Sequence, residues 1–156
     1  MEAVRPATPS DLPALAELSD HALAELAPTR GGAVFVAREG RAQPVADTLA
    51  ADVGDPSVCV LVGTIDDHPV GYAVGRTEAL RDGTTLGVIT DLYVEDGARS
   101  VGVGEAMMGS LLEFFRAAGC AGVDATALPG NRATKNFFEE SGFTARLLVM
   151  HHRLTT

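Results

Sequence analysis

The chain is short of cysteine and has no long apolar run, and each shortage excludes a class of protein. Its two cysteines, Cys59 and Cys120, form no Cys-x-x-Cys pair, so we expect reduced core thiols in place of a disulfide framework or metal ligands. No apolar run approaches the ~20 residues of a membrane span, and residues 1–6 lack the basic-then-apolar order of a signal peptide. We therefore expect a cytoplasmic protein that does not enter a membrane.

Positive charge is also scarce. The chain has 12 Lys and Arg residues against 21 Asp and Glu, a net charge of −9, which argues against binding nucleic acid or an anionic membrane by bulk electrostatics. The same charge is compatible with attraction of cationic substrates. The histidines offer no ligand cluster, because His151 and His152 are neighbours on a predicted strand and point to opposite faces. We predict no metal.

The first half of the chain alternates between predicted helices and strands. An apolar repeat at helical spacing over residues 12–26 predicts a helix, with Ser10 as its N-cap and Pro28 at its end. Residues 29–56 show no clear pattern beyond a short helix over 44–53. Four apolar stretches predict strands, of which the last three form an antiparallel meander: residues 4–7, 57–64, 70–77 and 85–94.

The second half predicts a parallel crossover. Apolar residues at spacings of three and four predict a helix over 103–118 that Gly119 ends, and residues 123–127 predict a strand parallel to the one before the helix. A helix over 131–140 and a final strand over 143–154 complete the pattern. With 156 residues, 46% of them hydrophobic, the chain predicts a single α/β domain on a mixed sheet, antiparallel in its first half and partly parallel in its second.

The most informative motif is Arg-Ser-Val-Gly-Val-Gly at residues 99–104, between a predicted strand and a predicted helix. Two glycines one residue apart let backbone N–H groups converge on one point, where the start of the helix adds partial positive charge. Such a turn binds a pyrophosphate, with Arg99 as a mobile cation at its rim. A dinucleotide-binding motif is excluded because Met107 stands where the third glycine belongs. A P-loop is excluded because it needs a lysine after the glycine, and the single lysine of the chain, Lys135, lies far from the loop. An ordinary packing turn stays an alternative.

Two motifs together resemble the GNAT superfamily of N-acetyltransferases. Arg-x-x-Gly-x-Gly after a strand ending Leu-Tyr-Val resembles its pyrophosphate loop, and residues 131–143, Asn-Arg-Ala-Thr-Lys-Asn-Phe-Phe-Glu-Glu-Ser-Gly-Phe, resemble Asn-x-x-Ala-x-x-Phe-Tyr-Glu-x-x-Gly-Phe. Residues 5–12 resemble the way many members open, so the likeness spans residues 5–143. It implies a GNAT-like fold, a twisted mixed sheet of about six to seven strands flanked by about four helices, and an acyltransferase that uses acetyl-CoA.

The resemblance also implies where acetyl-CoA binds as cosubstrate. In the superfamily the strand before the glycine loop splays from its neighbour and pairs with pantetheine, a role that falls here to Leu92, Tyr93 and Val94. The pyrophosphate is expected against the amides of the glycine loop and the helix start, with Arg99 nearby. These amides belong to Val101, Gly102, Val103, Gly104 and Glu105.

Two positions in the second motif carry alternatives. Asn131 corresponds to an asparagine that contacts the cofactor's arm, and it is equally what a helix N-cap requires. Phe138 stands near the cofactor where the superfamily usually has a tyrosine, offered as general acid to the departing thiolate, and a phenyl ring has no proton to give. Because an ordinary thiol has a pKa of ~8.5, CoA can leave as a thiolate stabilised by N–H dipoles. The phenylalanine therefore predicts a slower or differently assisted enzyme.

Asp91 is the candidate catalytic base. An alkylammonium with a pKa of ~10.4 must lose a proton before it attacks a thioester carbonyl. If no bulge intervenes, Asp91 shares a strand face with Ile89 and Tyr93, and apolar surroundings could raise its pKa. The alternatives are a structural carboxylate that accepts loop N–H groups and one that holds a cationic substrate.

Three function classes follow. The first is an N-acetyltransferase that transfers an acetyl group from acetyl-CoA to a primary amine of a small molecule or peptide, by direct attack in a ternary complex. The second is a non-catalytic acyl-CoA-binding or sensing domain, motivated by Phe138. The third is an unrelated phosphate-binding α/β domain. The expected partners are the amine and a second copy of the chain in a homodimer, without nucleic acid or membrane.

Overall fold

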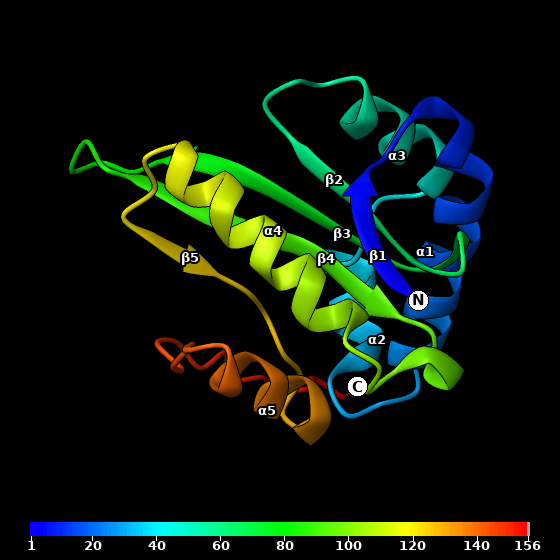
Figure 1. The fold of residues 1–156 in the computed structure, drawn as a ribbon. Coiled ribbons are helices and arrows are strands. Elements are labelled where there is room, and N and C mark those ends of the chain that lie inside the picture. The colour runs from blue at the N-terminus through cyan, green and yellow to red at the C-terminus, as the bar shows by residue number, and fades with distance from the viewer. Residues whose placement is uncertain (156) are drawn as a thin grey trace.

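The computed structural model describes residues 1–155 and contains one five-stranded sheet between helices (Figure 1). The first four strands are antiparallel and the fifth is parallel to the fourth, so the predicted mixed sheet and parallel crossover are confirmed, with five strands in place of six to seven. In sheet order the strands are β1 (Glu2–Pro6), β2 (Cys59–Ile65), β3 (His68–Ala79), β4 (Thr85–Val94) and β5 (Gly122–Asp124).

Five α-helices surround the sheet, one more than expected: α1 (Leu12–Leu26), α2 (Gly32–Arg38), α3 (Val45–Val53), α4 (Val103–Ala117) and α5 (Arg132–Glu140). Two short 3-10 helices, η1 (Pro9–Asp11) and η2 (Asp96–Ala98), precede α1 and α4. Figure 1 shows α4 across one face of the sheet and α1 with α3 on the other. No helix among residues 1–155 is long and apolar enough to cross a membrane.

Thr8 and Asp11 hold the start of η1, which leads directly into α1. The N-cap residue of α1 is Asp11, so the prediction of Ser10 as N-cap is wrong. Thr8 and Asp11 form a capping box, in which the Thr8 N–H donates to the Asp11 carboxylate at 2.8 Å. Arg5 of β1 donates two further hydrogen bonds of 2.8 Å to the same carboxylate and lowers the pKa of Asp11 to about 2. This ion pair ties the first strand to the first helix.

Each face of the sheet has its own core. The face under α4 is nearly flat because it carries glycine: a Cβ at Gly75 or Gly87 would lie 2.7 or 2.6 Å from ring atoms of Phe115. The helix therefore packs directly on the strand backbone, and Val103, Met107, Leu111 and Phe115 are all buried there. The opposite core joins α1 and α3 to the sheet through Leu15, Leu18, Leu49, Val62 and Tyr72.

A bulge in β4 corrects the expected environment of Asp91. Ile89 pairs with Gly75 and Asp91 pairs with Val74, so Thr90 is an extra residue in the ladder. Ile89 consequently faces the α4 core, whereas Asp91 lies on the side of α1. The shared face of Asp91 and Ile89 was expected only if no bulge intervened, and the bulge separates them because one inserted residue shifts the alternation by one.

The second half of the sheet is shorter than predicted. β5 pairs with β4 over only three residues, Leu86 to Val88, and the two strands then diverge (Figure 1). The predicted strand over 143–154 is wrong, because no backbone group after Phe143 pairs with another backbone group within residues 1–155.

Candidate active site

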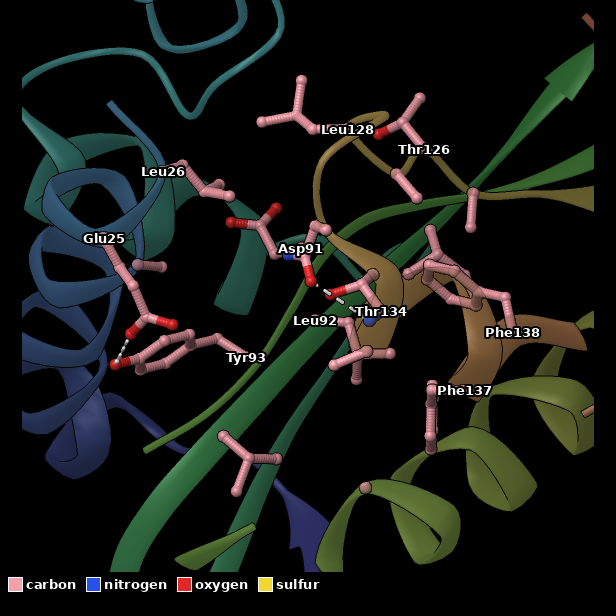
Figure 2. A pocket seen from close by; sticks show the side chains of 18 of the residues that line it. Glu25, Leu26, Asp91, Leu92, Tyr93, Thr126, Leu128, Thr134, Phe137 and Phe138 are labelled. Carbon is pink, nitrogen blue, oxygen red and sulfur yellow. Dashed lines mark hydrogen bonds between the residues drawn. The ribbon is translucent and has the colours of Figure 1, made fainter. Parts of the chain in front are cut away.

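A pocket of about 430 Å³ opens where β4 parts from β5. Figure 2 shows Glu25 of α1 beside Tyr93 of β4 on one side and Phe137 and Phe138 of α5 on the other. Most of the residues predicted for the site line it: Asp91, Leu92, Tyr93, Val94, Arg99, Gly104, Glu105, Asn131 and Phe138. Val101, Gly102 and Val103 do not line it.

The glycine loop ends at the pocket with its backbone donors free. Gly102 has a φ of +94° and precedes the first residue of α4, a conformation that glycine adopts without strain. Within residues 1–155, the N–H groups of Val103, Gly104 and Glu105 donate to no protein acceptor. They are the unsatisfied amides of a helix start, which favour an anion. The Val103 side chain itself points into the core and is 1% exposed.

Within residues 1–155, the edge of β4 that faces the pocket has no strand neighbour beyond Val88. Leu92, Tyr93 and Val94 occupy that unpaired length, and residues 125–128 line the far side of the opening. The separation leaves room for an extended group to lie along β4, which is the geometry that the resemblance implies for pantetheine.

Arg99 bridges the glycine loop and α1. Its Nε donates to the Val94 carbonyl at 2.8 Å, and its Nη2 lies 2.7 Å from Glu25. Its guanidinium also lies 5.6 Å from the centre of the Tyr93 ring, and the Tyr93 hydroxyl donates to Glu25 at 3.2 Å, the dashed line between these two side chains in Figure 2. Burial, with a smaller effect of the Glu25 charge, raises the pKa of Tyr93. Sequence reasoning missed Glu25, which lies three residues after the apolar position Ala22 and so borders the buried face of α1.

The Asp91 carboxylate accepts four hydrogen bonds. Arg41 donates two, from Nε at 2.8 Å and Nη2 at 2.9 Å, and the hydroxyls of Tyr72 and Thr90 each donate one at 2.7 Å. The Asp91 side chain is only 8% exposed. Burial, followed by the charge of Asp91, raises the pKa of Tyr72, so this phenol stays a donor. Both carboxylate oxygens are therefore occupied by protein donors.

Arg41 extends this contact into a buried ion network. Its side chain is 6% exposed and also lies 2.8 Å from Asp52 of α3, which in turn lies 2.8 Å from Arg76 of β3. Burial alone would lower the pKa of Arg41, but the hydrogen bonds and charges of Asp91 and Asp52 outweigh it and raise that pKa above its ordinary value. Sequence reasoning missed Arg41, which lies between α2 and α3 in the segment without a clear pattern.

The remaining predicted residues come from α5. Asn131 is the N-cap of that helix, and its side chain accepts from the Thr134 N–H at 3.2 Å. Its capping role is confirmed, and its contact with the cofactor stays a prediction. Phe138 is 8% exposed, and its ring centre lies 5.8 Å from that of Phe137 and 5.3 Å from that of Phe143. Phe138 therefore serves both the core and the pocket wall.

Other reactive groups lie outside this arrangement. Cys59 and Cys120 are free and half-buried, and burial raises the pKa of the Cys59 thiol. No group of three or more His, Cys, Asp or Glu side chains is placed to hold a metal ion in the part of the chain that the structure describes.

Comparison with known proteins gives the same family for most of the chain. The model of the Acetyltransferase (GNAT) family matches residues 21–143. No curated protein sequence matches the chain. Among solved structures, the tetramutant of the BH1408 protein from Bacillus halodurans has a TM-score of 0.82 at 20% identity, over 97% of this chain and 99% of that one.

Two further structures match at full length. An acetyltransferase from Trypanosoma brucei is 26% identical with a TM-score of 0.69, over 99% of this chain and 100% of that one. AAC(6′)-Iy, in complex with the bisubstrate analogue CoA-S-monomethyl-acetylneamine, is 14% identical with a TM-score of 0.76, over 100% of this chain and 99% of that one. The likenesses below 25% identity show a shared fold.

Proposed function

Because this chain belongs to the GNAT acetyltransferase family, we propose that it transfers an acetyl group from acetyl-CoA to a primary amine of a small molecule or peptide, in a ternary complex. The observation that carries the proposal is the pocket between β4 and α5. It joins free helix amides at one end to carboxylates at the other. A phosphate-bearing cosubstrate and a cationic amine both find partners there.

The cofactor wall of the pocket is formed by β4, α4 and α5. In the proposal, the pyrophosphate lies against the amides of the glycine loop, and the extended arm follows the open edge of β4 at residues 92–94. Supporting observations are the three unpaired amides and the absence of a strand neighbour on that edge within residues 1–155. One structural neighbour was solved with a CoA-based bisubstrate analogue bound.

The acceptor wall is formed by α1 together with Gly40 and Arg41, with Asp91 at its base. Glu25 and Asp91 line the pocket, and the chain has a net charge of −9, which favours an amine that arrives as a cation. Structural neighbours include AAC(6′)-Iy with an acetylneamine-based ligand and an aminoglycoside acetyltransferase from a soil metagenome with sisomicin. Aminoglycosides are therefore the first amines to test, beside polyamines, amino acids and peptides.

An amine that arrives as an ammonium must lose two protons from its nitrogen, one before attack and one as the amide forms, and the departing sulfur must gain one. The neutral amine attacks the thioester carbonyl, the C–N bond forms, the C–S bond breaks, and CoA leaves as a thiolate. Amides at the start of α4 and the open edge of β4 are the nearby dipoles that can stabilise charge in the pocket. Phe138 supplies no proton, so the thiolate takes one from solvent.

Asp91 stays our candidate base, and the competing hypothesis is that Asp91 only holds Arg41 in place. A general base must accept the amine's proton directly or through a water molecule. Among the residues that hydrogen-bond to Asp91, Thr90 is exposed, so a water molecule can replace the Thr90 hydroxyl as a partner of the carboxylate. Asp91→Asn should then lower kcat by about 100-fold, within the range for general base catalysis, and remove the acid limb of the pH profile while CoA affinity changes little.

The competing role has a different outcome. If Asp91 only anchors Arg41, Asp91→Asn lowers the melting temperature, but the folded variant keeps its kcat and pH profile. Thr90→Val serves as a control, because it removes one hydrogen bond to Asp91 and leaves both bonds from Arg41. Kinetics and thermal melts on the same preparations separate the two roles.

A non-catalytic acyl-CoA-binding domain is the second candidate, favoured by Phe138 at the position of the usual acid. Calorimetry with CoA, followed by a thiol-release assay across the amine panel, distinguishes the candidates. Binding with turnover supports the transferase, and binding without turnover for any amine supports the sensing domain. A chain that binds no CoA contradicts both.

A further inference from the structure

The Glu25 carboxylate lines the pocket and has a different partner on each of its two oxygens. Its Oε1 accepts a hydrogen bond from Arg99 at 2.7 Å, and its Oε2 accepts one from the Tyr93 hydroxyl at 3.2 Å (Figure 2). The side chains of Glu25 and Arg99 are 48% and 40% exposed. Because an exposed ion pair contributes little free energy, another ion can replace either member at small cost.

Arg99 has a second anion to bind besides Glu25. Its Nε donates to the Val94 carbonyl at 2.8 Å and fixes the guanidinium at the end of β4, while its two Nη atoms face the carboxylates of Glu25 and Asp96. The proposed function gives the same guanidinium to the pyrophosphate. A phosphate offers two oxygens to the planar fork of an arginine, whereas Glu25 offers one oxygen to Arg99. A phosphate that takes Arg99 therefore leaves the Oε1 of Glu25 without a partner.

Glu25 stays in position when Arg99 leaves it. The Tyr93 hydroxyl still holds the Oε2 of Glu25. One turn earlier in α1, the Nδ1 of His21 lies 3.4 Å from the carboxylate of Glu95, which follows β4. Neither contact involves Arg99, so both continue to tie α1 to the end of β4. The pocket wall then carries a fixed carboxylate with one free oxygen, which a cationic ligand satisfies.

The other carboxylate of the acceptor wall is already neutralised. Asp91 accepts two hydrogen bonds from Arg41 and one each from Tyr72 and Thr90, and its side chain is only 8% exposed. Glu25 is thus the acid of this wall that is left with unbalanced charge. An amine nitrogen held there stays an ammonium, whereas the nitrogen that attacks a thioester must be neutral. Recognition and attack therefore need two different nitrogens.

We propose that Glu25 binds a second cationic nitrogen of the acceptor, and that a phosphate of the cosubstrate releases Glu25 for this role by taking Arg99. This role rests on the proposed function and narrows its acceptor to amines with at least two basic nitrogens. Binding of the two substrates is then cooperative, because an ammonium on Glu25 also frees Arg99 for phosphate. Linkage requires the same factor in both directions.

Calorimetry of CoA binding, with and without an amine, measures this cooperativity in the absence of turnover. The probes are α,ω-diaminoalkanes of increasing length, at low ionic strength. In the unchanged chain the best diamine should raise CoA affinity about three- to five-fold, the factor that one exposed ion pair allows. Glu25→Gln should lose this response. Glu17→Gln removes the same charge from an exposed position of α1 outside the pocket and should keep it.

Initial rates with acetyl-CoA measure the selectivity for a second nitrogen. Each diamine is compared with the 1-aminoalkane of the same length, which lacks the nitrogen that Glu25 would hold. The ratio of kcat/KM for the diamine to kcat/KM for the monoamine should fall at least ~10-fold in Glu25→Gln, as for loss of a hydrogen bond to a charged group. The ratio should be unchanged in Glu17→Gln.

The outcomes separate the role of Glu25 from the transferase activity. A chain that binds no CoA overturns both. If CoA binds but no diamine raises its affinity, or if Glu25→Gln keeps the response or the rate ratio, Glu25 is not the anchor and the transferase proposal stands. Loss of the response in Glu17→Gln as well would assign it to net charge, which also overturns the role of Glu25. A chain without turnover contradicts the transferase, and the calorimetric response then decides on Glu25 alone.

Discussion

The cofactor wall and the acceptor wall of the pocket are assembled from different kinds of sequence. Residues 85–140 form the cofactor wall, which presents free backbone amides and apolar side chains beside polar ones. The acceptor wall depends on side chains brought from four places in the chain, since Arg41 joins Asp91 to Asp52 and Arg76 joins Asp52 to β3. One wall is therefore held by local packing and the other by buried charge.

This difference determines how each wall responds to a substitution. A buried charge that loses its partner stays desolvated and unpaired, so a single substitution lowers the free energy of unfolding. An apolar wall with free amides loses a ligand when a side chain fills the space, while the fold around it survives. Stability measurements should thus report on the acceptor wall and affinity measurements on the cofactor wall.

Arg41→Met should have the largest effect on stability. It leaves Asp91 and Asp52 buried without their shared cation, and breaking a buried ion pair costs about 3–5 kcal/mol in the free energy of unfolding. Arg38→Met is the control, because that side chain is 73% exposed and pairs only with its neighbour Glu39, a contact worth at most about 1 kcal/mol. Urea denaturation of both variants measures the difference. Equal losses would show that the acceptor wall does not depend on charge.

Gly104→Val should have the largest effect on cofactor affinity. A Cβ at Gly104 already lies 3.3 Å from the Phe137 ring, so the branched side chain fills the space over the free amides. We expect CoA affinity to fall at least ~100-fold, about 2.7 kcal/mol, in a protein that stays folded. Gly109→Val in the same helix, where a Cβ meets nothing within 4 Å, should bind normally. If calorimetry finds the same CoA affinity for the two variants, the phosphate does not bind at the glycine loop.

The cofactor wall could be predicted from the sequence because the motifs that indicate it are local in the chain. The glycine turn and the apolar repeat that follows it fix α4 from Val103 onward, as the structure confirms. Most of the residues proposed for the site meet in one pocket, although their roles stay predictions. The short helix over 44–53 was predicted inside the segment that otherwise shows no clear pattern, since a proline precedes it and Gly54 ends it.

The acceptor wall was not readable because its contacts join residues far apart in the chain. Arg41 has no periodic context, and its partner Asp91 lies 50 residues later. Thr90 shifts the alternation of side chains between the two faces of β4 by one residue, and the hydrophobic pattern of the sequence does not predict this bulge. The predicted final strand is absent for a related reason: its composition is that of a strand, but within residues 1–155 it pairs with no strand of the sheet.

Arg99 and Glu25 join the two walls, and their variants should change CoA affinity in opposite directions. In the structure the Glu25 carboxylate holds the guanidinium that the proposal assigns to phosphate. Arg99→Ala should lower CoA affinity by about 1–3 kcal/mol, less so at high salt. Glu25→Gln should raise it a few-fold, because it frees the guanidinium from an exposed pair worth at most about 1 kcal/mol. If Arg99→Ala lowers the melting temperature but leaves the dissociation constant unchanged, Arg99 only caps the end of β4.

Phe138→Tyr should have the smallest effect, and it tests the cofactor wall at the reacting end. Phe138 and Phe137 are neighbouring rings that both line the pocket, so a hydroxyl on either ring adds a polar group to the same cavity. Only the hydroxyl at position 138 would stand where the superfamily places its acid. If protonation of the thiolate limits turnover, Phe138→Tyr raises kcat several-fold with CoA affinity nearly unchanged, whereas Phe137→Tyr does not. A gain that appears equally in both variants would reflect pocket polarity alone. No gain in either would mean that thiolate departure is already fast, because the dipoles at the start of α4 stabilise it without an acid.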